Sequence, residues 1–251
     1  MLKNTIHENK VEFEVYGDYG LFSDPIMRVG GEKCTYQVPT YEALKGVLHS
    51  IYWKPTIIWI VDKVRIMNRI QTEVKGIRPI KYAGGGNDLA YYTYLKDCRY
   101  QVQAHFEWNE NRPELKDDQG PCNENKHHNM AKRFIKKGGR RDIYLGTREC
   151  QGYVEPCVFG EGKGYYDDLP QLAFGLMLHG ITYADEAYSD ETKDCMTARF
   201  WYPVMEQGVI TFPRPNQIPQ KYHKFLRKMD VKPFGKEMNN FIGLDEFEWV
   251  E

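Results

Sequence analysis

Apolar and polar residues alternate over residues 11–16 and, at greater length, over residues 98–108. An alternation with a period of two is typical of a strand that has one buried face. Residues 56–67 are rich in β-branched and aromatic side chains, which predicts a third strand that is buried at its start. Because two-faced strands favour antiparallel sheets with helices on one side, the pattern predicts such a sheet.

Apolar residues at helical spacing predict two helices. The first lies between Pro39 and Pro55, with Thr40 as its N-cap, and Pro55 prevents its continuation. Its apolar residues follow the i, i+3, i+4, i+7, i+8 spacing of one helix face: Leu44, Val47, Leu48, Ile51 and Tyr52. The second helix covers about residues 127–137 and is stopped by the glycine pair at 138–139.

These elements, with another strand at residues 153–159, follow the order strand, helix, strand, strand, helix, strand. That order is typical of the split βαβ, or ferredoxin-like, fold. From residue 162 onward, short strand-like runs alternate with turn residues, and roughly the last 30 residues have the composition of a loosely attached tail. We therefore expect the α+β class, with a ferredoxin-like domain over residues 1–161 and a small antiparallel β-sheet domain with the tail over residues 162–251.

The composition, with 41% hydrophobic and 27% charged residues among 251, is that of a folded globular protein. No apolar run approaches the roughly 20 residues of a membrane-spanning helix, and the N-terminus lacks a signal-peptide core, so we expect a cytoplasmic protein without membrane contact. Six cysteines without a C-x-x-C pair indicate reduced thiols. A zinc site at Cys122, His127 and His128 lacks the paired spacing of structural sites, and we expect neither a metal nor a cofactor.

A local surplus of positive charge contrasts with the formal net charge of −1. Residues 126–141 contain no acid and seven bases: Lys126, Lys132, Arg133, Lys136, Lys137, Arg140 and Arg141. Such a face can simply be solvated, but solvated helices usually mix both signs of charge. The glycine pair also places flexible backbone amides beside two guanidinium groups, a combination that suits phosphate. We expect the segment to bind nucleic acid.

A second basic stretch precedes the glycines at 84–86 and holds Lys63, Arg65, Arg69, Lys75, Arg78 and Lys81. Three tyrosines follow at positions 91, 92 and 94, where their rings can either stack on unpaired bases or pack in the core. Together the two basic stretches favour a groove in which phosphates supply affinity. The glycines at 84–86 match neither a dinucleotide-binding motif nor a P-loop, so no nucleotide cofactor is indicated.

The triplet Lys126, His127 and His128 stands at the predicted start of the basic helix. RNA carries its own nucleophile, the 2′-hydroxyl, so cleavage needs a base, a cation near the phosphate and an acid for the departing 5′-oxygen. Histidine can serve as base or acid near neutral pH, and lysine can supply the cation. The triplet therefore indicates either metal-independent RNA cleavage or simple solvated side chains.

Several longer strings carry a resemblance to a known family. They are GDYGLFSDP, YQVPTYEALKGVLHSIYWKPTIIW, GIRPIKYAGGGNDL, YTYLKDCRYQVQAHFEWNENRPEL, NKHHNMAKRFIKKGGRRDIYLGTRECQGYVEPC and FPRP. Over about residues 11–215 the chain resembles the CRISPR-associated endoribonuclease of the subtype I-C (Dvulg) system, the d subtype of the fifth Cas family in the RAMP superfamily.

The resemblance implies a ferredoxin-like (RRM-like) N-terminal domain, a small β-sheet C-terminal domain, and cleavage of the CRISPR precursor transcript within each repeat. It also implies catalysis by Tyr52, Lys126 and His127. The expected roles are His127 as base on the 2′-hydroxyl, Lys126 as stabiliser of the transition state, and Tyr52 as orienter or proton donor. The expected products are a 2′,3′-cyclic phosphate and a 5′-hydroxyl. The expected partners are the repeat hairpin with its flanking bases and the backbone and large subunits of a prokaryotic type I-C interference complex.

Two departures from the family pattern bear on these roles. Residues 119–125 form a slightly longer segment than the family pattern has, which affects the loop expected to present Lys126. His128 is a second imidazole, and only one of two adjacent helical residues can face the scissile bond because they point about 100° apart. Two other functions compete: a subunit that grips the 5′ handle of the guide RNA without cutting it, and a metal-dependent DNA nuclease, for which Asp117 and Asp118 are the adjacent acids in question.

Overall fold

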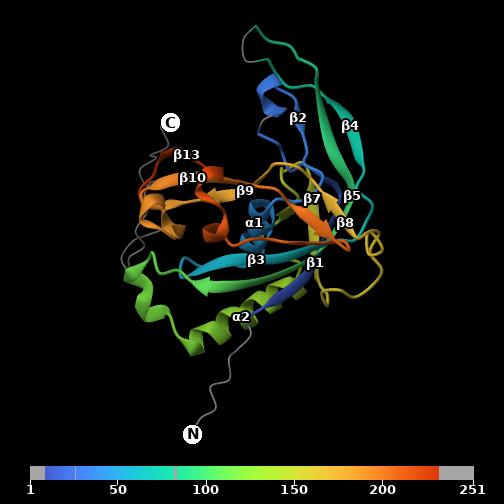
Figure 1. The fold of residues 1–251 in the computed structure, drawn as a ribbon. Helices are drawn as coiled ribbons and strands as arrows, with labels where there is room; N and C mark the ends of the chain where they lie inside the picture. Colours follow the sequence, from blue (N-terminus) through green and yellow to red (C-terminus); the bar gives the residue numbers. More distant parts are fainter. Residues whose placement is uncertain (1–8, 26, 82–83, 232–251) are drawn as a thin grey trace, which may run out of the picture.

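The computed structural model describes residues 9–25, 27–81 and 84–231, and these residues form an α+β fold dominated by β-sheet (Figure 1). The two α-helices described are α1 (Tyr41–Ile51) and α2 (Pro121–Lys136). The described strands are β1 (Val11–Gly20), β2 (Lys33–Cys34), β3 (Ile57–Ile66), β4 (Thr72–Ile77), β5 (Ala90–Trp108), β6 (Ile143–Tyr144), β7 (Gln151–Pro156), β8 (Gln171–Ala173), β9 (Met177–Thr182), β10 (Cys195–Trp201), β11 (Val204–Glu206), β12 (Val209–Thr211) and β13 (His223–Lys228).

The larger sheet has the order β6-β7-β1-β5-β3-β12-β11-β8, and β2 and β4 also pair with β5. Strand β5 is antiparallel to both β1 and β3, and β1 is antiparallel to β7. The alternate apolar side chains of β1 and β5 are buried, as in Phe13, Val15, Val102 and Ala104, and these residues share one core cluster with both helices. The strands predicted from alternation and from the apolar run at residues 56–67 are therefore confirmed, as is the α+β class.

Helix α1 forms as the sequence predicts. The Thr40 hydroxyl accepts a hydrogen bond from the Ala43 amide at 3.1 Å, which satisfies one of the free amides of the first turn. Leu44, Leu48 and Ile51 are almost fully buried against the sheet. The helix ends at Ile51, four residues before Pro55, so Tyr52 is its C-cap residue in an extended conformation.

Helix α2 begins at Pro121, six residues before the predicted start. Residues 121–126 contain no apolar periodicity, which is why the sequence pattern missed this turn and a half. Pro121 suits the first helical position, since its fixed φ is helical and its missing N–H would have no partner there. Lys126 and His127 therefore lie within the helix and are not presented by a loop. Gly138, with a φ of 80° that favours glycine, follows the end of the helix as predicted.

Two elements of the structure were not predicted from the sequence. Within the second basic stretch, residues 72–77 form β4, which pairs with the first part of β5 in a hairpin that extends from the body (Figure 1). The supposed tail contains β13, which pairs with β10 through residues 223–228. Residues 232–251 of that predicted tail lie outside the described residues.

Strands β13, β10 and β9 form a separate antiparallel sheet of the C-terminal part. Strands β8, β11 and β12 also follow residue 162 but belong to the larger sheet, because β12 pairs with residues 63–65 of β3. The division into domains at residues 161 and 162 stays a prediction. Within the described ranges, no helix is long and apolar enough to cross a membrane.

Candidate functional site

Tyr52 is held in place from several sides. Its backbone N–H donates to the Leu48 carbonyl at 2.8 Å, and its carbonyl accepts from the Trp59 indole N–H at 2.7 Å. Its ring is nearly parallel to that of Phe134 on α2, with centroids 6.0 Å apart. With only 2% of its surface exposed, Tyr52 joins the end of α1 to the middle of α2.

The Tyr52 hydroxyl oxygen lies 2.6 Å from Nδ1 of His127, which is a short hydrogen bond between residues 75 positions apart in the sequence. Burial raises the pKa of Tyr52, and the positive charge of Arg140 opposes this shift to a smaller extent. The phenol is therefore protonated at neutral pH. Because its oxygen can accept from Nδ1–H or donate to bare Nδ1, the contact fixes the ring of His127 whichever tautomer is present.

Aromatic rings surround His127. Trp108 meets its ring edge-on at a centroid distance of 5.6 Å, and Phe106 does so at 6.2 Å. Only 7% of His127 is exposed. The imidazole is therefore enclosed by aromatic rings, and its Nδ1 contacts the Tyr52 hydroxyl.

The side chains of Lys126 and His128 lie outside these aromatic surroundings. Lys126 is exposed, and Nε2 of His128 donates to the Lys10 carbonyl at 2.7 Å. Of the two adjacent imidazoles, His127 is thus the one that meets Tyr52. The one-residue offset on α2 separates the two rings, as the helix rotation of about 100° per residue requires.

The other predicted RNA-binding residues all lie on the surface. Each is exposed, and none forms an ion pair with a carboxylate among the residues that the structure describes: Lys132, Arg133, Lys136, Lys137, Arg140 and Arg141. Lys132 and Lys136, with His128, line a groove of about 570 Å³ between α2, Lys10 at the start of β1 and the end of β7. This side of α2 therefore carries positive charge that no described carboxylate pairs with.

The loop after α2 does not offer free amides to an anion, contrary to the sequence-based expectation. The N–H groups of Arg140 and Arg141 both donate to the Ser50 carbonyl, at 3.1 and 3.0 Å. Those of Gly138 and Gly139 donate to carbonyls of the last turn of α2. An anion at this loop would therefore be met by the two guanidinium groups, and the loop itself anchors α2 to the end of α1.

The second basic stretch is divided by the fold. Arg65 is buried and makes contacts of 2.7 and 2.9 Å with the Asp167 carboxylate, so it holds the loop after β7 and is not available to nucleic acid. Of the three tyrosines on β5, Tyr94 is buried and packs, whereas Tyr91 is 50% exposed on the hairpin arm. The exposed bases of this stretch are Arg69, which lies before β4, and Arg78 and Lys81, which lie between β4 and β5.

No group of three or more His, Cys, Asp or Glu side chains that could hold a metal ion is found within the described residues. Of the two imidazoles considered for a zinc site, His127 directs Nδ1 to the Tyr52 hydroxyl and His128 directs Nε2 to the Lys10 carbonyl. The side chain of Cys122 lies outside the described part of the structure, as do those of Asp117 and Asp118.

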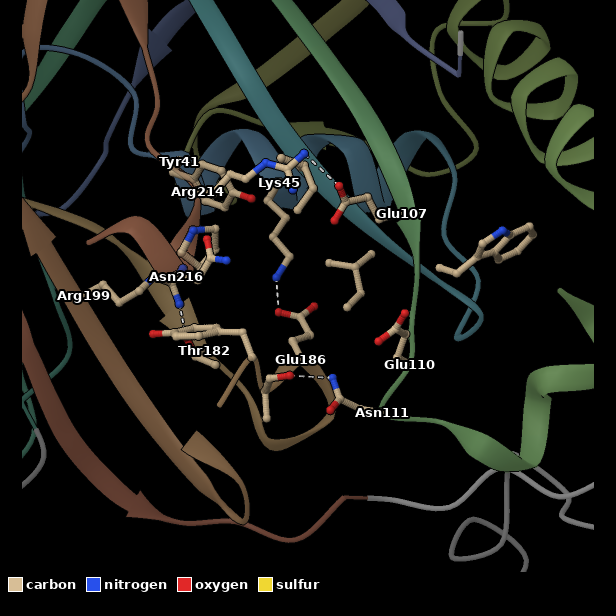
Figure 2. Close-up of a pocket in the computed structure, with 16 residues that line it drawn as sticks. Tyr41, Lys45, Glu107, Glu110, Asn111, Thr182, Glu186, Arg199, Arg214 and Asn216 are labelled. Carbon is tan, nitrogen blue, oxygen red and sulfur yellow. Dashed lines mark hydrogen bonds and ion pairs between the residues drawn. The ribbon is translucent and has the colours of Figure 1, made fainter. Parts of the chain in front are cut away.

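A polar cavity near the Tyr52–His127 pair was missed by the sequence interpretation. Its volume is about 470 Å³, and it is lined by Lys45, Glu110, Glu186 and Arg199 among others (Figure 2). These residues come from α1, from the chain just after β5 and from the C-terminal part, so no local sequence signal joins them. Trp108 lines this cavity and also contacts His127.

Comparison with known proteins places these features in a family. The family model described as "CRISPR-associated protein (Cas_Cas5)", of the Cas5d type, matches residues 11–213. The CRISPR pre-crRNA endoribonuclease Cas5d of Mannheimia succiniciproducens is 38% identical over 245 residues, covering 82% of this chain and 95% of that protein. The protein of the same name from Thermus thermophilus is 29% identical over 157 residues, covering 59% of this chain and 64% of that protein.

Two solved structures agree in fold. One, described as a crystal structure of a CRISPR-associated protein, has a TM-score of 0.68 and 34% identity over 83% of this chain and 94% of its own. The other, the functionally uncharacterized protein SMU1763c from Streptococcus mutans, has a TM-score of 0.67 and 35% identity over the same shares, 83% and 94%. The match over most of the sequence and the agreement in fold confirm the predicted resemblance: the chain belongs to the Cas5d family of CRISPR-associated proteins.

Proposed function

We propose that this protein is a metal-independent endoribonuclease that cleaves CRISPR precursor RNA within its repeats. The observation that carries the proposal is the 2.6 Å contact between the Tyr52 hydroxyl and Nδ1 of His127, which pairs an orienting group with a base. Relatives that are named CRISPR pre-crRNA endoribonucleases support the substrate class.

His127 acts as the general base. When Nδ1 is held by Tyr52, Nε2 is the ring atom that takes the proton from the 2′-hydroxyl. The 2′-oxygen then attacks the adjacent phosphorus and the P–O5′ bond breaks, which leaves a 2′,3′-cyclic phosphate. The departing 5′-oxygen takes up a proton from solvent water and becomes a 5′-hydroxyl. A buried hydroxyl that fixes the base does here what the buried acid does for histidine in a catalytic triad.

Lys126 stabilises the charge that develops on the phosphate. It is exposed and adjacent to His127 on the same helix turn, so its flexible chain can follow the phosphate while the imidazole stays fixed. The buried position of Tyr52 favours an orienting role for its hydroxyl over direct contact with the RNA.

The RNA lies along the exposed bases of α2 and the loop after it, which are Lys132, Arg133, Lys136, Lys137, Arg140 and Arg141. Their positive charge, unpaired among the described residues, supports binding to phosphates with release of counterions. Recognition uses the shape of the repeat hairpin and a few flanking bases, because the A-form major groove is too narrow for side chains to read.

We also propose a ferredoxin-like N-terminal domain over residues 1–161 and a C-terminal domain over 162–251. The sheet order β7-β1-β5-β3 supports this assignment, with β1 and β3 both antiparallel to β5. Helix α1 connects β1 to β3 and helix α2 lies between β5 and β7, as in the split βαβ pattern. The protein remains bound to its product in the cytoplasm as a subunit of a type I-C interference complex, with backbone and large subunits as partners.

A second function is a subunit that holds the 5′ handle of the guide RNA without cutting it. One observation favours it: with 7% of its surface exposed, His127 can reach a 2′-hydroxyl only if the surrounding rings part when RNA binds. The endonuclease proposal therefore requires that opening.

The two functions are separated by cleavage of a repeat-hairpin RNA in excess EDTA. Wild type should cut the RNA, His127→Ala should not, and His128→Ala should retain cleavage at saturating RNA because its ring faces away from Tyr52. A 2′-deoxy substitution at the scissile nucleotide should abolish the reaction. If wild type binds the RNA tightly and cuts none of it, the handle-binding function replaces the endonuclease.

A further inference from the structure

We propose that the polar cavity beside His127 receives one unpaired nucleobase of the RNA, next to the scissile phosphate. The cavity lies between α1, the first residues of β3, the end of β5 and the C-terminal strands, and its volume of about 470 Å³ falls within the usual range of small-molecule sites. This inference rests on the proposed function, since it assigns a subsite to the same substrate.

The position of the cavity relative to the candidate catalytic residues comes from Trp108. Its indole lines the cavity and also meets the His127 ring at a centroid distance of 5.6 Å. A phosphate placed at His127 therefore puts the base of an adjoining nucleotide at the mouth of the cavity. Because Trp108, Ile58 and Ile60 are all lining residues, part of the wall is apolar and one ring is available for a base to pack on.

The charges of the cavity nearly cancel, which disfavours a phosphate as its occupant. Lys45 forms an ion pair with Glu186, and Arg214 forms one with Glu107 at 2.8 Å. A ligand that brought a further net charge would have to compete with these pairs. A neutral polar ligand would not.

Arg199 and Glu110 are two of the polar lining groups that can recognise such a ligand. Arg199 is only 1% exposed, and its Nε has no hydrogen-bond partner among the described residues. Glu110 forms no ion pair with a described residue, and Figure 2 shows it across the space from Arg199. A guanidinium and a carboxylate on opposite sides suit a flat heterocycle that carries both N–H donors and ring or carbonyl acceptors, which is the chemistry of a nucleobase.

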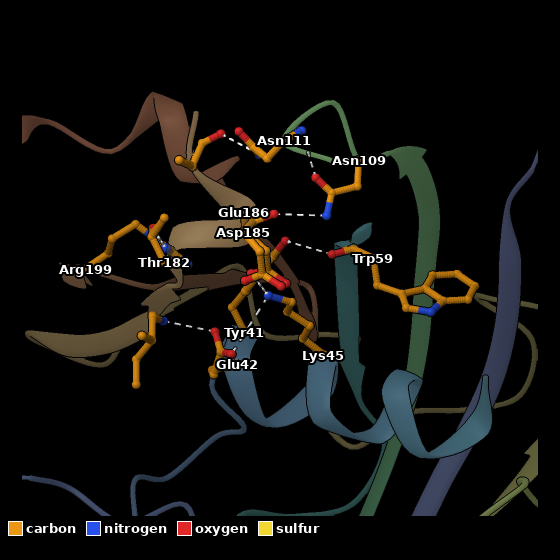
Figure 3. Close-up of polar contacts among 12 residues, drawn as sticks. Tyr41, Glu42, Lys45, Trp59, Asn109, Asn111, Thr182, Asp185, Glu186 and Arg199 are labelled. Atoms are coloured by element: carbon orange, nitrogen blue, oxygen red, sulfur yellow. Dashed lines mark hydrogen bonds and ion pairs between the residues drawn. The ribbon is translucent and has the colours of Figure 1, made fainter. Parts of the chain in front are cut away.

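The walls are fixed before any ligand binds (Figure 3). Glu42 on α1 accepts from the Ile181 amide at 2.9 Å, and Asn109 donates through Nδ2 to the Asp185 carbonyl at 2.9 Å. Asn111 donates to the Ala187 carbonyl at 2.8 Å. These bonds join α1 to β9, and the chain just after β5 to the segment after β9, so ordering the site adds little to the cost of binding.

The test uses repeat-hairpin RNAs that carry the non-cleavable 2′-deoxy group and an abasic nucleotide at each unpaired position in turn. Dissociation constants are measured for wild type, for Glu110→Gln, which removes the charged acceptor, and for Asn216→Trp, which fills the cavity from an exposed loop position. Glu206→Gln, an exposed acid on β11, is the matched control. Both altered sites are on the surface, so folding is preserved.

One abasic position next to the scissile phosphate should weaken binding by wild type about tenfold, as expected for loss of a hydrogen bond to a charged group. Both cavity variants should weaken binding of the intact RNA and leave binding of that abasic RNA unchanged, while the control variant changes neither. If each cavity variant weakens binding of the intact RNA and of every abasic RNA by the same factor, the inference is overturned.

Binding and cleavage together distinguish failure of the base site from failure of the endonuclease proposal. We call it coupling when the cavity variants weaken binding of the intact RNA but not of the abasic RNA. If wild type fails to cut the cleavable RNA but this coupling is observed, the endonuclease proposal fails and the base site remains. If the RNA is cut without metal and no coupling is found, the reverse holds. Absence of any RNA binding by wild type overturns both.

Discussion

Replacement of Tyr52 by Phe removes one oxygen atom from the centre of the candidate site. The ring, its stacking on Phe134 and the backbone bonds at the end of α1 are all retained, since none of them uses the hydroxyl. What disappears is the 2.6 Å contact with Nδ1 of His127. The variant therefore tests the orienting role with little disturbance of the fold.

The magnitude follows from that contact. Loss of one partner from a buried hydrogen bond costs roughly 1–3 kcal/mol of folding stability, because Nδ1 is left without its acceptor or donor. In the reaction, an imidazole that is free to shift by about 1 Å can lower the rate about 100-fold, which corresponds to about 2.7 kcal/mol of activation free energy. RNA affinity should change little, because only 2% of the Tyr52 surface is exposed.

The assay is single-turnover cleavage of repeat RNA at saturating protein, with Tyr91→Phe on the exposed hairpin as the matched control. The rate constant of Tyr52→Phe should fall about 100-fold, with its dissociation constant unchanged. The double variant Tyr52→Phe/His127→Ala should be no slower than His127→Ala alone, since Tyr52 acts through His127. A wild-type rate for Tyr52→Phe, or a further loss in the double variant, would refute the orienting role.

Two other predictions concern the surface and the pH dependence. Replacing Arg140 and Arg141 by Ala should weaken RNA binding and reduce the slope of the logarithm of the binding constant against the logarithm of salt concentration, by the amount expected for the loss of up to about two phosphate contacts. The slope is measured by titration between low and moderate salt, and an unchanged slope would show that the loop does not contact the RNA. Burial, with a smaller effect of the Lys45 charge, lowers the pKa of His49 to about 3. Below about pH 6.5 the unfolded chain then binds more protons than the folded chain, so the free energy of unfolding should fall as the solution is acidified. In urea unfolding, the free energy of unfolding of His49→Gln should fall by about 1–2 kcal/mol less than that of wild type between pH 7 and pH 5. Equal losses in the two proteins would contradict the assigned cause.

The elements that the sequence predicted well are those whose pattern is set by one buried face. Helix α1 has a side-chain cap at Thr40, a buried apolar stripe and Pro55 after its end, and all three features are local. The strands that the sequence pattern missed have no continuous buried apolar face. Strand β4 alternates between exposed and half-exposed residues, and β13 is exposed over nearly its whole length, so neither shows an apolar period.

The candidate site was less accessible to such reasoning. Residue spacing alone indicated Lys126 and His127 as a possible catalytic pair, whereas Tyr52 had only the pattern of a packing residue and was identified through the family resemblance. The contact between Tyr52 and His127 depends on how α1 packs against α2, which no local pattern encodes. The cavity depends on residues 41–216 folding together, and its unpaired donor at Arg199 becomes visible only in the structure.

Helix α2 explains how the proposed catalytic group, which is buried, and the proposed binding surface, which is exposed, can occupy neighbouring positions. His127, Ala131 and Ile135 recur every four residues and are all buried, so they form the face that packs on the core and holds the imidazole against Tyr52. His128 and Lys132 follow the same spacing one residue later and line the groove. Four residues advance the helix by about 6 Å. Phosphates bound along the face of His128 and Lys132 therefore lie at fixed distances along the helix from the imidazole of His127. Under the proposed function, the packing that buries His127 thus also sets where the RNA must lie to be cut.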